Sequence, residues 1–179
     1  MPFIILFPDL PPPGCDRLPT RGDPPPETVE EQAVELWEVV ARESIRDIVA
    51  RYNANGDSGR FDQVLELFAP DAVMEIVGEA PKVGRDEIRT IFTGAKDRAE
   101  WGDRPVYLRH MTGTHQIDLV DETHATGRCY YFVITAIGLD HWGRYLDEYC
   151  VVDGAWRFAR RKVHTDGRSP DALFAPAPD

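Results

Sequence analysis

The sequence predicts an α+β domain in which a curved antiparallel sheet wraps around a long helix. Amphipathic helix-like stretches occupy residues 28–98, and strand-like stretches dominate residues 107–164. Helices followed by a run of strands with tight turns are typical of α+β domains. A sheet that curves strongly around a helix leaves a cone-shaped pocket.

The long first helix is expected from Thr28 to about residue 55. Thr28 and Glu31 have the spacing of a capping box, and apolar residues recur at steps of three and four as far as Tyr52. The residues Asn-Gly-Asp-Ser-Gly at 55–59 then break the helix. This turn leaves the carboxylate of Asp57 at the mouth of a helical hairpin.

Two shorter helices and a series of strands follow this turn. We expect a second helix from Phe61 to Phe68, ended by Pro70, and a third from about residue 85 to 98. The expected strands are residues 72–77, 107–120, 123–137, 142–152 and 155–164. The second of these is interrupted at Gly113.

Composition limits the domain organisation and the partners. The 179 residues suggest one domain, at residues 27–166, with a proline-rich arm at 1–26 and a tail at 167–179. The arm holds nine of the 15 prolines, so it should be extended, either free or strapped across a neighbouring subunit. A formal charge of −11 disfavours nucleic acid and anionic membranes as partners.

Targeting and redox signals favour a cytoplasmic location. No stretch approaches the roughly 20 apolar residues that span a bilayer, and the apolar start lacks the basic region of a signal peptide. The 3 cysteines have no CxxC spacing, which argues against a disulfide framework or a zinc ribbon.

Asp57 and His110 are the candidate catalytic residues. Histidine is suited to general base catalysis because its unperturbed pKa is about 6.5. An aspartate bonded to it fixes the tautomer and stabilises the imidazolium. In the alternative interpretation, Asp57 only caps the second helix, and the ring of His110 only has its hydrogen bonds satisfied at a strand edge. Spacing alone favours that alternative.

The sequence gives no indication of a metal or cofactor site. His110 and His115 are five residues apart, so a regular strand would send their side chains to opposite faces. A metal centre needs three or four converging ligands. No glycine-rich phosphate loop is present either, and we therefore expect no cofactor.

Seven short stretches of the sequence are informative together, because of their order and spacing along the chain. They are residues 44–52, 56–62, 67–73, 84–88, 109–112, 143–145 and 153–158. In this order they resemble the NTF2-like superfamily, and within it the SnoaL-like group, over about residues 30–165. The resemblance implies a cone-shaped α+β fold with an apolar cavity. Members include polyketide cyclases, scytalone dehydratase, a dehydrochlorinase, bile-acid dehydratase, steroid isomerases, dioxygenase small subunits and non-catalytic proteins.

The resemblance also implies site residues. Asp57 falls at the acid position, and His110 at the histidine position, of the dehydratase and dehydrochlorinase branches. Arg161 is the nearest match to an arginine that contributes in the dehydrochlorinase. For Arg161, the alternative is a surface or ion-pair residue.

Aromatic residues are the candidates for substrate binding. They are Tyr52, Tyr131, Tyr149 and Trp101. Phenolic donors could line a cavity, although aromatic residues on helix stripes and strands more often pack in the core.

The leading hypothesis is a cofactor-free lyase or isomerase, dehydratase- or cyclase-like, acting on a small apolar metabolite such as a polyketide, a steroid or an aromatic compound. One alternative is a non-catalytic small-molecule-binding protein of the same fold. Another is the structural small subunit of a ring-hydroxylating dioxygenase, which would need a large iron-bearing partner. We also expect a homo-oligomer, dimer or trimer, because the strand at residues 130–137 is apolar on both sides.

Overall fold

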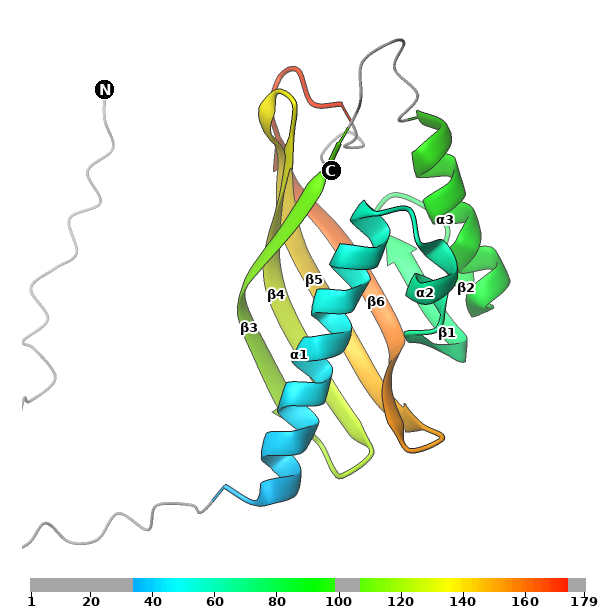
Figure 1. Cartoon of the computed structure of the whole chain (residues 1–179), viewed down its shortest axis with the longest axis vertical. Helices are drawn as coiled ribbons and strands as arrows, with labels where there is room; N and C mark the ends of the chain where they lie inside the picture. The colour runs from blue at the N-terminus through cyan, green and yellow to red at the C-terminus, as the bar shows by residue number, and fades with distance from the viewer. Residues whose placement is uncertain (1–33, 99–106, 174–179) are drawn as a thin grey trace, which may run out of the picture. The chain divides into compact units, whose positions relative to one another are not determined.

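Three helices and one six-stranded sheet form the part of the chain that the computed structural model describes, residues 34–98 and 107–173 (Figure 1). The helices are α1 (Leu36–Asp57), α2 (Phe61–Leu65) and α3 (Gly84–Arg98). The strands are β1 (Phe68–Ile76), β2 (Lys82–Val83), β3 (Arg109–Leu119), β4 (His124–Thr135), β5 (Gly138–Val152) and β6 (Ala155–Arg168). The expected α+β fold class is therefore confirmed. The proline-rich arm, the cap at Thr28 and Trp101 lie outside the described residues.

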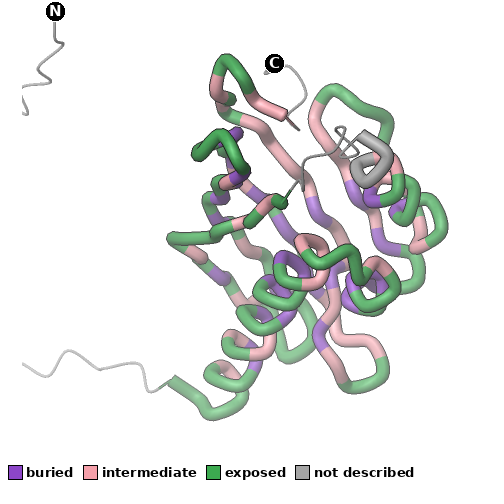
Figure 2. Tube along the Cα trace, turned by 45° about the horizontal axis from the view of Figure 1, so that its top comes forward, coloured by how far each residue is buried: buried purple, intermediate pink, exposed green. Residues whose placement is uncertain are grey.

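The sheet is curved and has the strand order β2-β1-β6-β5-β4-β3. Neighbouring strands are antiparallel except for β1 and β6, which are parallel. Helix α1 crosses one face and contacts β3 and β6, while α3 contacts β1 (Figure 1). Buried and exposed positions alternate along the strands, so one face carries the core under α1 (Figure 2).

The buried face of α1 differs from the expected stripe in its first half. Ala41, Ile45 and Val49 are buried, whereas Leu36 and Val40 are exposed. Both sets recur every four residues, so periodicity alone does not select between them. The expected and the observed buried faces coincide toward the end of the helix, where Ile48 and Tyr52 are buried as expected.

The centre of the core holds a buried ion pair between β5 and β6. Arg161 is 0% exposed, and its Nε and Nη2 donate to the carboxylate of Asp147 at 2.9 and 2.7 Å. The guanidinium carbon lies 4.2 Å from the ring centroids of Tyr52, Tyr145 and Phe158. Aromatic faces attract this cation. Arg161 is thus an ion-pair residue of the interior, and the surface location considered for it is wrong.

Strand β1 begins earlier than the sequence suggests. Phe68 and Pro70 belong to this strand and do not end a helix. The register between β1 and β6 shifts between Phe68 and Val73. A proline is tolerated in a sheet at such an irregularity, because no ladder hydrogen bond is required from its nitrogen.

An extra residue in β3 changes which side chains share a face. The pairing with β4 shifts between Gly113 and Gln116, and Thr114 has a φ of 52°. The expected interruption at Gly113 is confirmed. The bulge brings His115 to the face that carries α1, where its Nε2 lies 3.3 Å from the Tyr149 hydroxyl. The expectation that His110 and His115 face opposite ways is therefore wrong.

Removing one partner of the buried ion pair should destabilise the fold strongly. Asp147→Asn leaves the guanidinium of Arg161 buried without a countercharge, and we expect a loss of about 3–5 kcal/mol in the free energy of unfolding. Urea titration followed by circular dichroism measures this loss. The control is Glu148→Gln, at the neighbouring exposed position, with an expected change of at most about 0.5 kcal/mol. Unfolding of Asp147→Asn at the wild-type urea concentration would contradict the expectation.

Candidate active site

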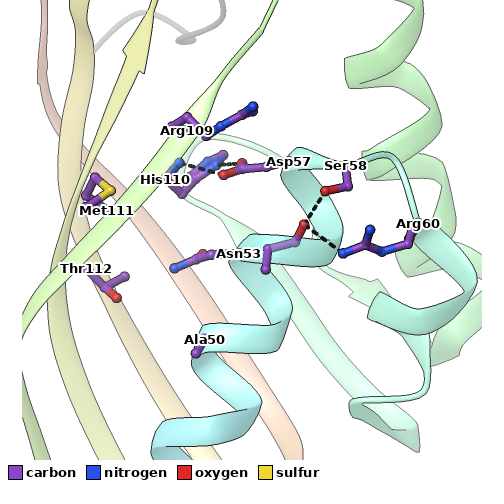
Figure 3. A pocket seen from close by; sticks show the side chains of 10 residues that line it. Ala50, Asn53, Asp57, Ser58, Arg60, Arg109, His110, Met111 and Thr112 are labelled. Atoms are coloured by element: carbon purple, nitrogen blue, oxygen red, sulfur yellow. Dashed lines mark hydrogen bonds and ion pairs between the residues drawn. The ribbon is translucent and has the colours of Figure 1, made fainter.

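Asp57 and His110 meet between the end of α1 and the start of β3 (Figure 3). The Nδ1 atom of His110 lies 2.6 Å from Oδ1 of Asp57. The backbone N–H of His110 donates to Oδ2 of the same carboxylate at 2.9 Å. One carboxylate therefore holds both the ring and the main chain of His110. The side chains lie within the hydrogen-bonding reach that the sequence analysis expects.

The end of α1 places the Asp57 carboxylate. The helix runs through Asn55 and Gly56 to Asp57, two residues beyond the expected end, and Gly59 then turns the chain with a φ of 69°. The N-cap of α2 is Arg60, without a side-chain hydrogen bond to the helix. The interpretation of Asp57 as a cap for α2 is therefore wrong, because its carboxylate binds His110.

The hydrogen bond to Asp57 selects one form of the His110 ring. A carboxylate only accepts, so a neutral imidazole bonded to it carries its proton on Nδ1. The lone pair is then on Nε2, the atom that can take a proton from another molecule. The side chain of Asp57 is 7% exposed and that of His110 is 25% exposed. The acid is thus enclosed, while the ring remains accessible.

An open cavity of about 510 Å³ adjoins this pair. It is lined by residues from the second half of α1, the following turn and the start of β3: Ala50, Asn53, Ala54, Asp57, Ser58, Arg60, Arg109, His110, Met111 and Thr112. The volume is typical of sites for small molecules. Ala50 and Ala54 give it apolar wall area, and the other side chains that line it are mostly polar or charged, among them Asn53, Asp57 and His110.

The expected substrate-binding tyrosines are buried in the core and do not line this cavity. Tyr149 donates its hydroxyl to Asp147 at 2.9 Å, and Tyr52 packs on Arg161. Tyr131 comes nearer, with its ring centroid 6.3 Å from that of His110. Burial raises the pKa of all three phenols, so they stay neutral near pH 7. Arg161 is not among the residues that line the cavity either.

A second histidine–aspartate pair, missed in the sequence, lies on the same face of the sheet. The Nδ1 atom of His141 is 2.7 Å from Oδ1 of Asp140, whose side chain is fully buried. Val133 pairs with both His110 and His141, so the two histidines flank it across β3, β4 and β5. The Tyr131 ring approaches both histidine rings. The Asp-His dipeptide at 140–141 is a signal in the sequence, but these residues lie between the expected strands 123–137 and 142–152.

Burial lowers the pKa of His141, the carboxylate of Asp140 opposes this shift, and positive charge on His110 lowers the pKa further.

Across residues 34–98 and 107–173, no cluster of His, Cys, Asp and Glu side chains has the arrangement of a metal site. Nor does any helix in these ranges have the length and apolar character needed to span a bilayer.

Comparison with known proteins identifies a family. The model of a family described as "SnoaL-like domain" matches residues 37–162. The match covers most of the described chain, including Asp57, His110 and Arg161. No match is found among curated proteins.

Solved structures show the same fold. A putative scytalone dehydratase from Novosphingobium aromaticivorans is 22% identical, with a TM-score of 0.68 over 79% of this chain and 95% of that chain. LinA is 17% identical, with a TM-score of 0.65 over 79% and 98%. A protein from Catenulispora acidiphila in complex with S-DNPA is 24% identical, with a TM-score of 0.61 over 72% and 95%. Similarity at these identities shows a shared fold.

The closeness of the two histidines can be tested by titration. His110→Gln removes the ring whose charge, when protonated, lowers the pKa of His141, so the pKa of His141 should rise. Long-range proton–nitrogen NMR of the imidazoles measures this pKa. His124→Gln, on an exposed turn beside Asp121, is the control and should leave it unchanged. An unchanged or lower pKa of His141 in His110→Gln would contradict the arrangement.

The lowered pKa of His141 also makes the stability of the fold depend on pH in a definite direction. The unfolded chain binds a proton at His141 more readily than the folded chain, so the free energy of unfolding should fall as pH drops below about 6.5. His141→Gln should weaken this dependence on the acid side, as seen in urea titrations between pH 7 and pH 5. An identical acid-side slope in the variant and the wild type would count against a buried, neutral His141.

Proposed function

We propose, because this chain belongs to the SnoaL-like domain family and joins Asp57 to His110, that it is a cytoplasmic, cofactor-free lyase or isomerase. The reaction is dehydratase- or cyclase-like, and the substrate is a small, largely apolar metabolite. The distance of 2.6 Å between His110 Nδ1 and Asp57 Oδ1, beside an open cavity, carries this proposal.

His110 is the general base of the proposed reaction. Its Nε2 removes a proton from a carbon beside a carbonyl group, and the electron pair of the broken C–H bond forms a C=C bond. In an elimination, the neighbouring hydroxyl leaves and takes the proton from the imidazolium, so that water is the second product. In an isomerisation, the same proton returns to a different carbon. General base catalysis of this kind contributes about 10²–10⁴-fold.

Asp57 supports this base in two ways. It holds the ring so that Nε2 is the unprotonated nitrogen, and its negative charge stabilises the imidazolium that forms. The carboxylate also bonds the His110 main chain, which limits movement of the ring away from the cavity. Asp57 is therefore a positioning residue, and His110 is the residue that contacts the substrate.

The cavity suits the proposed class of substrate. Its walls include the methyl groups of Ala50 and Ala54, which favour an apolar skeleton such as a polyketide, a steroid or an aromatic compound. The related protein from Catenulispora acidiphila was solved with a small molecule bound, which supports a small-molecule role for the fold. Of the aromatic candidates, Tyr131 is the one next to His110, and we propose that it closes the inner side of the site.

The outer face of the sheet supports the proposal of a homo-oligomer. Met111 pairs with Phe132, and Phe132 with Trp142, in one row across β3, β4 and β5. All three side chains are exposed in the single chain, as is Tyr130 beside them. Contiguous apolar surface of this kind marks an interface, and we propose that a second copy covers it in a dimer or trimer.

Substitution of the pair tests the proposed chemistry. A bicyclic β-hydroxy ketone that aromatises to a naphthol on losing water gives a direct optical readout. We expect His110→Gln to lower kcat/KM by about 10²–10⁴-fold because the base is lost. Asp57→Asn should lower kcat by about 10²-fold or more through the wrong tautomer.

The matched control for these variants is His124→Gln, which removes an exposed histidine on the β3–β4 turn and should keep wild-type turnover. Undiminished turnover in His110→Gln would contradict the proposal. A wild-type chain that binds such ketones but leaves them unchanged would indicate a binding protein of the same fold.

The proposed oligomer predicts a mass in solution of two or three times 20.2 kDa. Phe132→Glu places a charge in the middle of the apolar row, so it should shift light scattering toward the monomer. Thr126→Glu, at an exposed position of the same strand outside that row, is the control and should keep the oligomer. A wild-type mass of about 20 kDa at all protein concentrations would contradict this proposal.

A further inference from the structure

We propose that the amide of Asn53 binds a hydroxyl group of the substrate, so that the site selects hydroxylated molecules over plain hydrocarbons and organohalides. The inference rests on the proposed function, because Asn53 lines the cavity of Asp57 and His110. Asn53 lies on α1 one helical turn before Asp57. Its side chain extends from the helix toward β3, between Asp57 and Thr112 (Figure 3).

Asn53 is buried, and the oxygen of its amide is unpaired among the described residues. The residue is 7% exposed, and its Oδ1 has no hydrogen-bond partner among the described residues. Buried polar atoms nearly always have a partner, since leaving one unpaired is costly. The other asparagine of this helix, Asn55, is only half-buried, and its Oδ1 accepts a bond from Arg60 Nε at 3.0 Å.

Arg161 also has a buried polar atom without a hydrogen-bond partner. Its Nη1 is also unpaired among the described residues, but the guanidinium is enclosed by aromatic rings and bound to Asp147. It does not line the cavity, so no ligand is needed to explain it. Asn53 differs because it lines the open cavity and its side chain extends toward β3 (Figure 3).

The neighbours of Asn53 define the chemistry that it can bind. His110 and Thr112 are two residues apart on β3, so both side chains point to the same face of the strand. Ala50 and Ala54 flank Asn53 on α1 and offer no polar atom. A ligand between helix and strand therefore meets one amide, one hydroxyl and the Nε2 of His110 beside the methyl groups of Ala50 and Ala54, while Ser58, Arg60 and Arg109 also line the cavity.

A hydroxyl group satisfies this arrangement better than other small groups. A carboxamide has an oxygen that accepts and an NH2 group that donates, and this holds whichever of the two positions each group is assigned. A hydroxyl group both donates and accepts, so it can pair with either one. A halogen or a C–H edge donates no proper hydrogen bond and would leave Oδ1 buried and unpaired. Sites built to bond a hydroxyl reject analogues that lack it, for this reason. The bonded hydroxyl also fixes which carbon of the ligand lies at His110.

Binding of two probes of equal skeleton tests the inference. A naphthol and naphthalene are titrated into the wild type, Asn53→Leu and Gln63→Leu, and binding is followed by ligand fluorescence. We expect the wild type to bind the naphthol about tenfold more tightly than naphthalene, and Asn53→Leu to bind both about equally. Gln63→Leu, which removes an exposed amide on α2, should keep the tenfold ratio.

The melting temperature of the ligand-free variants gives an independent readout. Because Oδ1 of Asn53 has no hydrogen-bond partner among the described residues, Asn53→Leu should melt at the wild-type temperature or ~2–4 °C above it. A fall of several degrees would show that the amide supports the fold, and this would overturn the inference. So would an unchanged probe ratio in Asn53→Leu, or a wild type that does not prefer the naphthol.

These outcomes are distinct from failure of the proposed reaction. A wild type that prefers the naphthol, loses the preference in Asn53→Leu, and never dehydrates a β-hydroxy ketone would overturn the catalytic role of His110. It would leave the hydroxyl site of Asn53 in place.

Discussion

The buried Arg161–Asp147 ion pair determines how the interior of this fold is arranged. Its guanidinium lies among the rings of Tyr52, Tyr145 and Phe158, and therefore joins α1 to β5 and β6. A buried charge is costly to separate from its partner, so these elements are held in one relative position. With aromatic rings filling the space under the middle of α1, the open cavity lies toward the C-terminal end of that helix.

The position of the Asp57–His110 pair follows from this core. Tyr52 packs on Arg161, and Asp57 comes slightly more than one helical turn later, at the end of α1. The axial position and rotation of the helix at Tyr52 therefore fix where the carboxylate points. Strand β3 is at the edge of the sheet, and Asp57 bonds both the main chain and the ring of its His110.

Local sequence patterns predicted most of the elements but not the details that depend on pairing. Helix α3 and the interruption at Gly113 follow from turn and helix signals, and the meeting of Asp57 with His110 follows from the family resemblance. The orientation of His115 toward the core does not follow from local patterns, because the position of the bulge depends on the register between β3 and β4. Arg161 lies between two other basic residues, Arg160 and Lys162, and only the opposing carboxylate of Asp147 explains its burial. Asn53 gave the weakest signal, as one polar residue in an apolar stripe.

The tautomer of His110 is the property on which the proposed chemistry depends most directly. Long-range proton–nitrogen NMR on the wild type, at a pH where this imidazole is neutral, reports which ring nitrogen carries the proton. We expect the proton on Nδ1, bonded to Asp57, with Nε2 unprotonated and facing the cavity, and we expect Asp57→Asn to abolish this preference. A neutral His110 with its proton on Nε2 in the wild type would contradict its role as the base.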